Sequence, residues 1–376
     1  MTVPLDLDDV AAVTAADPQG MLRDVASASA QVRAAQVLSA EAGLSALADE
    51  GRPRAVVVCG MGGSGIAGDV LAALAGTTCP VPVVVHRGFG LPAWVGAADL
   101  VIAVSCSGRT EETLSGLEEA VRRGCRLLVV GASGSPLEDL AGRGRGLFVP
   151  AQQGRQPRAS MWSLSVPLLV AGHALGLLTA GPAELEEAAT VLEQVAVRCR
   201  PDADGLLNPG KALALELAEA LPVVWGTSPL SGTAAYRFAC QLNENAASPA
   251  TWGVLPEAGH NQVVALDGPW AGRSTSDEDL FRDREDEPER PVLRLVLLRD
   301  PGALPAVALR ADVCRDLAAR RGVGVSSLQA EGVTPVARLA SLVATTDFAS
   351  TYLALAQGTD PTPVGAITEL KGRTSR

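Results

Sequence analysis

The sequence predicts an α/β protein that holds two doubly wound domains in tandem, each built around a parallel sheet. The first observation is a glycine-rich turn, Gly60-Met-Gly-Gly-Ser-Gly65, which follows the apolar run Val56–Val58. An apolar run without alternation is typical of a buried parallel strand. The second observation is that further apolar runs alternate with helical patterns, as in βαβ units. The third is that this order restarts near Leu221.

The first half of the chain shows this alternation most clearly. Apolar residues at helical spacing predict one or two leading helices between Gln19 and Glu50. Apolar runs predict strands at 56–58, 81–86, 100–105, 126–130 and 146–149. Helical patterns follow at 114–123, 136–142 and 161–178. Strands separated by helices in this way form a parallel sheet with helices on both faces.

The second half repeats the pattern after a predicted linking helix at 183–198. The order strand, turn, helix occurs again here, with a predicted strand at 221–225, a Gly/Ser turn at 226–232 and a helix at 234–242. Apolar runs predict later strands at 263–266, 292–298 and 323–328, with a closing helix at 336–357. We interpret this half as a second copy whose glycine turn has changed. The predicted domains are residues 19–180 and 183–376.

Composition excludes several classes of function. The chain has 376 residues and a formal net charge of −11, without a basic stripe, which argues against a nucleic-acid partner. The segment 274–290 has eight acidic and three basic side chains and few apolar ones, so we predict a solvated surface loop.

Cysteine usage and the N-terminus predict a soluble, cytoplasmic protein. The seven cysteines form no C-x-x-C pair and no zinc-ligand spacing with histidine, which is typical of buried thiols in a reducing compartment. The first 18 residues are acidic and lack the pattern of a signal peptide. The apolar run 164–178 is too short to span a bilayer.

The glycine-rich turn predicts a binding site for an anion, most simply a phosphate. Free backbone N–H groups and the positive end of the helix dipole meet there, and glycine lets a ligand approach the backbone. The turn also fits the G-x-G-x-x-G pattern of dinucleotide-binding proteins. Such a protein would need an acidic residue about 20 positions later to hold the ribose. The second predicted strand instead ends at His86-Arg87, and Arg87 leaves an NADP-dependent dehydrogenase open as an alternative.

A second turn favours a compact phosphate monoester. Ser105-Cys-Ser-Gly-Arg-Thr110 follows the strand 100–105 and opens another helix. Ser105, Ser107 and Thr110 would bring three hydroxyls close to free N–H groups at a helix N-terminus. The alternative is an ordinary cluster of helix-capping side chains, which accounts for one such hydroxyl more readily than for three.

These two turns together resemble the sugar isomerase (SIS) domain. Over about residues 19–373 the chain resembles the bifunctional phosphoglucose/phosphomannose isomerase family. Further stretches carry this resemblance: 156–159, 243–246, 256–261, 361–364 and 369–371. The resemblance implies two SIS domains in tandem, and it assigns the sugar phosphate to Gly63, Ser64, Ser105, Ser107 and Thr110. Arg109 and Gly365 depart from the family pattern, which usually has Asn and Asp there.

The resemblance also implies the catalytic residues of an aldose–ketose isomerase. Glu244 would move a proton between C2 and C1 through an enediol, and Arg158 would stabilise the enediolate oxygen. His260 and Lys371 would open the sugar ring, so the last helix would fold back over the site. Without the resemblance, Glu244 would be read as a surface or cap residue and Lys371 as a tail lysine, and His260 could equally be an ordinary loop histidine. The guanidinium of Arg158 suits an oxyanion. No metal or redox cofactor is implied.

The expected activity is interconversion of glucose 6-phosphate or mannose 6-phosphate with fructose 6-phosphate. The family resemblance implies a homodimer in which the ring-opening histidine reaches the neighbouring subunit's active site. A non-catalytic SIS protein that senses a sugar phosphate is an alternative, although Glu244 and His260 would be superfluous in it. The NADP-dependent dehydrogenase is the other alternative.

Overall fold

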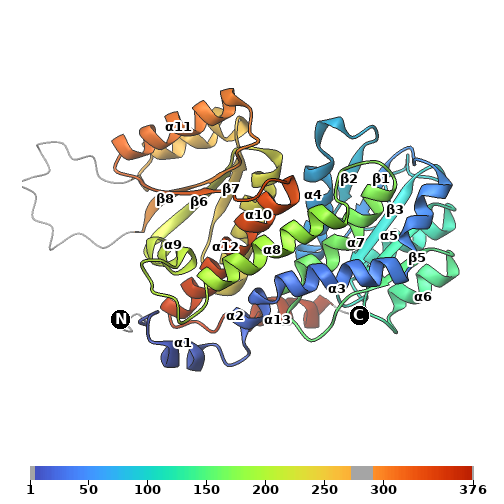
Figure 1. Ribbon diagram of the computed structural model, residues 1–376, viewed down its shortest axis with the longest axis horizontal. Coiled ribbons are helices and arrows are strands. Elements are labelled where there is room, and N and C mark those ends of the chain that lie inside the picture. The colour runs from blue at the N-terminus through green and yellow to red at the C-terminus, as the bar shows by residue number, and fades with distance from the viewer. Residues whose placement is uncertain (1–4, 272–290, 375–376) are drawn as a thin grey trace, which may run out of the picture. The chain divides into compact units, whose positions relative to one another are not determined.

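A computed structural model describes residues 5–271 and 291–374 of the chain (Figure 1). The predicted acidic loop at 274–290 lies outside the described residues. The chain divides into two compact units, each with one sheet. The five-stranded unit comprises residues 24–194 and 331–341, and the four-stranded unit comprises residues 1–23, 195–330 and 342–376. A parallel sheet in each unit confirms the predicted α/β fold with two doubly wound domains.

The sheet of the five-stranded unit is parallel throughout, with the strand order β2-β1-β3-β4-β5. Its strands are β1 (Val56–Cys59), β2 (Val83–His86), β3 (Leu100–Ser105), β4 (Arg126–Gly131) and β5 (Leu147–Pro150). All five were predicted within two residues. The order reverses at β1, whose neighbours are β2 and β3. In an open parallel sheet, the carboxyl ends of strands at such a reversal form a crevice for ligands.

Helices cover both faces of this sheet. α4 (Gly62–Ala75) packs against β1, β2 and α7 (Met161–Ala174), and α7 packs in turn against α3 (Ala28–Glu41). α5 (Glu111–Arg122) and α6 (Pro136–Arg143) pack together over the other face. Alternate residues of a strand point to opposite faces of the sheet. Val57 therefore belongs to the core under α5, whereas Val58 lies against Gly68 of α4.

The four-stranded unit has a second parallel sheet, with the order β7-β6-β8-β9. Its strands are β6 (Ala220–Gly226), β7 (Thr251–Val254), β8 (Val292–Arg299) and β9 (Gly324–Gln329). α10 (Pro229–Ala246) packs on β6, β7 and β8, while α11 (Pro305–Arg320) and the 3₁₀ turns 257–260 and 262–267 pack with the core of the opposite face.

One predicted strand of this unit is wrong. Residues 263–266 belong to a 3₁₀ turn, Gln262–Asp267, and only Leu266 is buried there. The edge strand is instead β7, which sequence reasoning did not identify. Its first two residues, Thr251 and Trp252, are exposed, so β7 lacks the continuous apolar run that indicates a buried strand.

The remaining helices connect or flank the two sheets. They are α1 (Val10–Ala16), α2 (Met21–Ala26), α8 (Pro182–Arg198), α9 (Pro209–Leu217), α12 (Pro335–Ala356) and α13 (Gly365–Thr374). Among the described residues, α12 alone is long and apolar enough to cross a membrane, and the apolar stretch that qualifies is fully buried. It carries the buried carboxylate of Asp347, so we interpret it as a core helix.

Candidate functional site

The glycine-rich turn between β1 and α4 is shaped by close backbone approaches. A Cβ atom on Gly60 would lie 3.1 Å from the carbonyl oxygens of Ser64 and Val104, and one on Gly65 would lie 2.8 Å from the Gly60 oxygen. Gly62 begins α4 and has a φ of +52°. Only glycine fits these positions without strain. The turn therefore presents the first N–H groups of α4 at the carboxyl end of β1, as predicted.

The side chain of Ser64 joins this turn to the second one. Its Oγ accepts a hydrogen bond of 3.2 Å from the backbone N–H of Cys106. Ser64 is 8 % exposed, and Cys106 directly follows the last residue of β3. Two turns that lie far apart in the sequence are thereby fixed side by side at the point where the strand order reverses.

The predicted hydroxyls of the second turn form a cluster of their own. Ser105 Oγ lies 2.9 Å from Thr110 Oγ1 and 3.5 Å from Ser107 Oγ, and Ser107 Oγ accepts from the backbone N–H of Arg109 at 3.3 Å. Thr110 is the N-cap residue of α5, but within the described chain its hydroxyl does not cap the helix. The three hydroxyls thus contact one another and the N–H of Arg109.

Arg158 lies in the same unit, beside the glycine-rich turn. It belongs to the 3₁₀ turn Pro157–Ala159, and the residue is 4 % exposed. A Cβ atom on Gly63 would lie 3.6 Å from the Arg158 Cα and from the Pro157 oxygen. Both distances are ordinary van der Waals contacts, so the segment that carries the guanidinium lies directly against the phosphate turn.

Sequence reasoning missed one residue that fixes this segment, Gln31 of α3. Its amide nitrogen donates to the Ala159 oxygen at 2.8 Å, and its amide oxygen accepts from the Ser163 N–H at 3.4 Å. Gln31 is 1 % exposed. A glutamine inside a helical pattern gives no signal for such a contact, because its partners lie far along the chain.

Glu244 and the other predicted acid/base residues lie in the four-stranded unit. Glu244 is partly exposed near the C-terminal end of α10. Its neighbour Asn245 is 1 % exposed and donates to Ser350 Oγ at 2.9 Å, while Asn243 donates to the Ala239 oxygen at 2.7 Å. The two amides that flank Glu244 therefore form hydrogen bonds within α10 and between α10 and the segment that contains Ser350.

His260 is exposed at the end of the 3₁₀ turn Glu257–His260. The following residues hold this turn: Asn261 donates to Glu257 Oε1 at 2.8 Å, and Gln262 donates to the Trp252 oxygen at 3.0 Å. Gln262 also accepts from the indole N–H of Trp225 at 2.6 Å. The histidine thus lies on a turn held by these hydrogen bonds, and it lines an apolar groove together with residues of α11.

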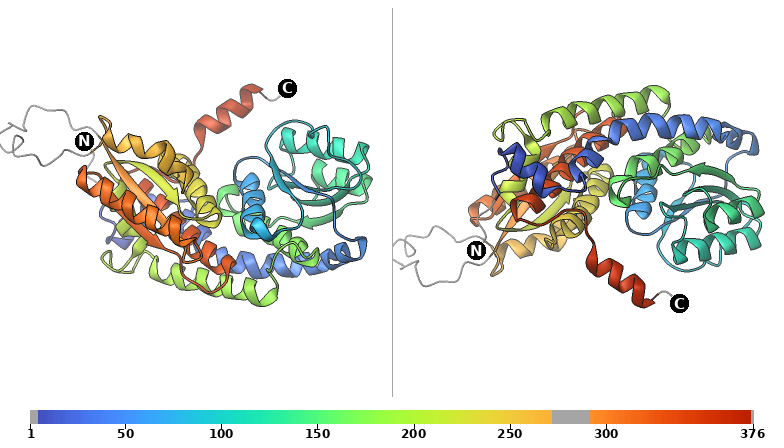
Figure 2. Two further views of the ribbon diagram at one scale, coloured as in Figure 1. Left: turned by 90° about the horizontal axis from the view of Figure 1, so that it is seen from above. Right: turned by 90° about the horizontal axis from the view of Figure 1, so that it is seen from below.

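Lys371 lies on α13, and the structure does not show this helix folded back onto its unit. No residue of α13 is buried, and its apolar side chains Ile367 and Leu370 are 38 % and 63 % exposed. Figure 2 shows α13 projecting from the unit that holds α10 and α11.

The predicted site residues therefore fall into two sets. The five-stranded unit brings together Gly63, Ser64, Ser105, Ser107, Thr110 and Arg158, and the four-stranded unit holds Glu244, His260 and Lys371.

The second Gly/Ser turn, before α10, already holds an anion supplied by the chain. Ser228 Oγ donates to the carboxylate of Asp300 at 2.7 Å, and the Asp300 N–H donates to Thr227 Oγ1 at 2.9 Å. Asp300 is 8 % exposed. A carboxylate near a helix N-terminus is stabilised by the dipole. This turn therefore differs from the first one, as its changed glycine pattern indicates.

Two further observations bear on cofactors. The Arg87 guanidinium forms an ion pair with Asp69 and donates to the Gly65 oxygen at 3.4 Å. Arg87 thus contacts α4. In an NADP-binding protein the same guanidinium would instead have to bind the 2′-phosphate of the cofactor. Within residues 5–271 and 291–374, no three His, Cys, Asp or Glu side chains are grouped so that they could hold a metal ion.

Comparisons with known proteins identify a family model and relatives of similar sequence. Residues 206–373 match the bacterial phospho-glucose isomerase C-terminal SIS domain. The bifunctional phosphoglucose/phosphomannose isomerase of Caldicellulosiruptor bescii is 33% identical over 318 residues, which cover 85% of this chain and 88% of the relative. The protein of the same name from Aquifex aeolicus is 32% identical over 320 residues, which cover 85% of this chain and 89% of that relative.

Solved structures share the fold. A glucose-6-phosphate isomerase-like protein from Thermus thermophilus matches with a TM-score of 0.59 and 18% identity, covering 98% of this chain and 100% of that one. The C-terminal domain of a glucosamine-fructose-6-phosphate aminotransferase from Francisella tularensis matches with a TM-score of 0.64 and 12% identity, covering 91% and 97%. At these identities the likeness concerns the fold. Sequence identity over most of both chains shows that the protein belongs to the bifunctional phosphoglucose/phosphomannose isomerase family.

Proposed function

We propose that the protein is an aldose–ketose isomerase that interconverts glucose 6-phosphate, mannose 6-phosphate or both with fructose 6-phosphate. The observation that carries this proposal is the cluster of three hydroxyls, Ser105, Ser107 and Thr110, joined through Ser64 to the glycine-rich turn. A compact cluster of hydroxyls and N–H groups at two helix N-termini suits a phosphate monoester. The curated relatives above carry the same activity in their names.

In this mechanism the phosphate turns bind the substrate and Glu244 moves a proton. The Glu244 carboxylate removes the proton from C2 of the open-chain aldose, and the C1 carbonyl oxygen becomes part of an enediolate. The same carboxylate, now protonated, returns the proton to C1. At the same stage the O2 hydroxyl gives up its proton as the carbonyl forms at C2, and O1 takes up a proton to become the hydroxyl of the ketose. The substrate therefore neither gains nor loses a proton overall, which requires one group that serves as both base and acid.

Arg158, His260 and Lys371 have supporting roles in the proposal. The guanidinium of Arg158 stabilises the negative charge on the enediolate oxygen, because it stays protonated and presents several donors. His260 and Lys371 move protons at the ring and C1 oxygens while the sugar ring opens. Each of these steps uses side chains of the protein, and we assign no cofactor.

We further propose that the active form is a homodimer in the cytoplasm, with an active site at the subunit interface. His260 is exposed and lines an apolar groove, and α13, which carries Lys371, has no buried residue. Both features support a second subunit as the surface that these residues meet. Light scattering behind size exclusion tests this: a mass near 77 kDa, twice the 38.5 kDa of one chain, supports the dimer, and 38.5 kDa contradicts it.

The test of the activity is formation of fructose 6-phosphate from glucose 6-phosphate and from mannose 6-phosphate. Turnover of either supports the proposal, and the ratio of the two values of kcat/KM identifies the preferred substrate. Tight binding of both sugar phosphates without turnover would instead favour the non-catalytic sensor. Saturable binding of NADPH, measured by its fluorescence, would favour the dehydrogenase.

A further inference from the structure

α10 carries a row of polar side chains on the side that meets α12. Arg237, Gln241 and Asn245 follow one another at intervals of four residues, so they lie on one face of the helix. All three are buried, with exposed fractions of 2 %, 2 % and 1 %. Burying a polar group at a contact between helices costs free energy unless that group has a hydrogen-bond partner.

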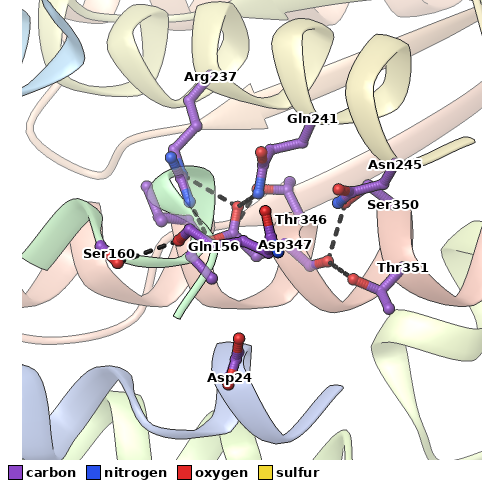
Figure 3. Close-up of polar contacts among 12 residues, drawn as sticks. Asp24, Gln156, Ser160, Arg237, Gln241, Asn245, Thr346, Asp347, Ser350 and Thr351 are labelled. Atoms are coloured by element: carbon purple, nitrogen blue, oxygen red, sulfur yellow. Dashed lines mark hydrogen bonds and ion pairs between the residues drawn. The ribbon is translucent and has the colours of Figure 1, made fainter. Parts of the chain in front are cut away.

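Two residues of α12 supply these partners (Figure 3). Asp347 accepts from Arg237 through both oxygens, at 3.0 Å from Nε and 2.7 Å from Nη2, and it also accepts from Gln241 Nε2 at 3.2 Å. Ser350 Oγ accepts from Asn245 at 2.9 Å and donates to the backbone carbonyl oxygen of Asp347 at 2.9 Å. Burial raises the pKa of the Asp347 carboxyl, and the Arg237 guanidinium opposes that rise. A two-pronged contact of this kind fixes both the rotation of α10 and its position along α12.

Glu244 stands at the end of this row. It follows Arg237 by seven residues, which places it within about 20° of the same angular position on an α-helix. It directly precedes Asn245, and unlike the row itself it is partly exposed. With a helix radius of about 5–6 Å including side chains, a 10° rotation of α10 would move its carboxylate by about 1 Å. A displacement of about 1 Å can lower an enzymatic rate by about 100-fold.

We propose that Arg237, Gln241, Asn245, Asp347 and Ser350, the α10–α12 polar row, are positioning residues that fix the orientation of the Glu244 carboxylate. This inference rests on the role of Glu244 in the proposed function. Stability alone accounts poorly for the row, because apolar side chains of similar volume often replace a buried ion pair without loss of stability. Fixing the register of two helices is the use for which buried polar contacts are best attested.

The test compares Ser350→Ala and Asp347→Asn with a matched control, Thr346→Val. Thr346 is buried on α12 beside Asp347, and its hydroxyl bonds back to Leu342 and Val343 of the same helix. We expect Ser350→Ala and Asp347→Asn to lower kcat by about 10-fold or more with KM changed less than twofold, because the phosphate turns are untouched. Thr346→Val should leave kcat within twofold of the wild type, whatever its effect on the melting temperature.

A double-mutant cycle with Glu244→Gln separates positioning from a general effect on folding. If the row acts through Glu244, Ser350→Ala should cause no further loss of rate in the Glu244→Gln background. The same loss in both backgrounds, or a loss of kcat in Thr346→Val as large as that in Ser350→Ala, would overturn the inference. Where Glu244→Gln has no measurable rate, the separation of kcat from KM and the Thr346→Val control decide the question. Full activity of Glu244→Gln would instead contradict the proposed role of the base.

Discussion

At the scale of single residues, the phosphate turns could be predicted because their signals are local. The glycines and hydroxyls stand within six residues of each other in each turn, and their geometry follows from a strand that leads into a helix. The contact between Gln31 and Ala159 could not be predicted, because it joins residues 128 positions apart. The same holds for Asp347, whose partners lie on another helix.

Ser107 tests the binding role of the hydroxyl cluster. Its side chain is exposed, so Ser107→Ala should fold normally while losing one hydrogen bond to the phosphate. A hydrogen bond to a charged group contributes about 1.5–3 kcal/mol, which predicts a rise in KM of about 10-fold or more. Steady-state kinetics with glucose 6-phosphate measures this.

The matched control is Ser133→Ala, at an exposed serine after the neighbouring strand β4. It should leave KM within twofold of the wild type. Equal effects of the two substitutions, or an unchanged KM in Ser107→Ala, would show that Ser107 does not bind the phosphate.

At the scale of elements, prediction succeeded where a strand is buried and failed at a sheet edge. β3 and β4 each contain an unbroken apolar run of at least four residues, and their first residues were predicted correctly. β7 is an edge strand with exposed Thr251 and Trp252, so its pattern resembles a loop. The run 263–266 is apolar enough for a strand but too short to distinguish one from a turn.

The C-terminal helix α13 allows activity to be separated from stability. Because none of its residues is buried, a chain that ends at Val364 should keep the melting temperature of the wild type within about 2 °C. The same truncation should abolish isomerase activity, since it removes Lys371. Differential scanning fluorimetry and the isomerase assay on one preparation provide both measurements.

A single substitution refines this test. Lys371→Met should lower kcat by about 100-fold, as expected for loss of an acid/base group. Arg373→Met, two residues later on the same exposed helix, removes an equal charge and should have little effect. Full activity of the truncated chain would exclude Lys371 from the mechanism.

At the scale of the whole molecule, the internal repeat could be read from the order of strands, turns and helices. The composition of each compact unit could not, because the five-stranded unit takes in residues 331–341 and the four-stranded unit takes in residues 1–23. Such exchanges depend on packing that no local pattern encodes. We keep the division into residues 19–180 and 183–376 as a proposal about the repeat in the sequence.

Buried thiols predict how the stability of the five-stranded unit depends on pH. Burial raises the pKa of Cys59 to about 12, and it also raises the pKa values of Cys106 and Cys125. An unfolded thiol ionises near pH 8.5. Above that pH the unfolded chain loses protons that the folded chain keeps, so the free energy of unfolding falls as pH rises toward the folded pKa.

The expected decline is up to about 1.4 kcal/mol per pH unit for Cys59, with full stability retained below about pH 8.5. Urea unfolding at pH 7.5, 9 and 10 measures it, and Cys59→Ala should flatten the dependence. A free energy of unfolding that stays constant over this range would contradict the burial of the thiol.

The most direct test of the proposed function is Glu244→Gln, compared with Glu219→Gln. Glu219 is an exposed glutamate of the same unit, so its substitution makes an equal change of charge. An amide cannot accept the C2 proton, so we predict that Glu244→Gln lowers kcat on glucose 6-phosphate and mannose 6-phosphate by about 100-fold or more, with KM little changed. Glu219→Gln should behave as the wild type does. A Glu244→Gln protein that retains kcat within about threefold of the wild type would contradict the proton-transfer role of Glu244.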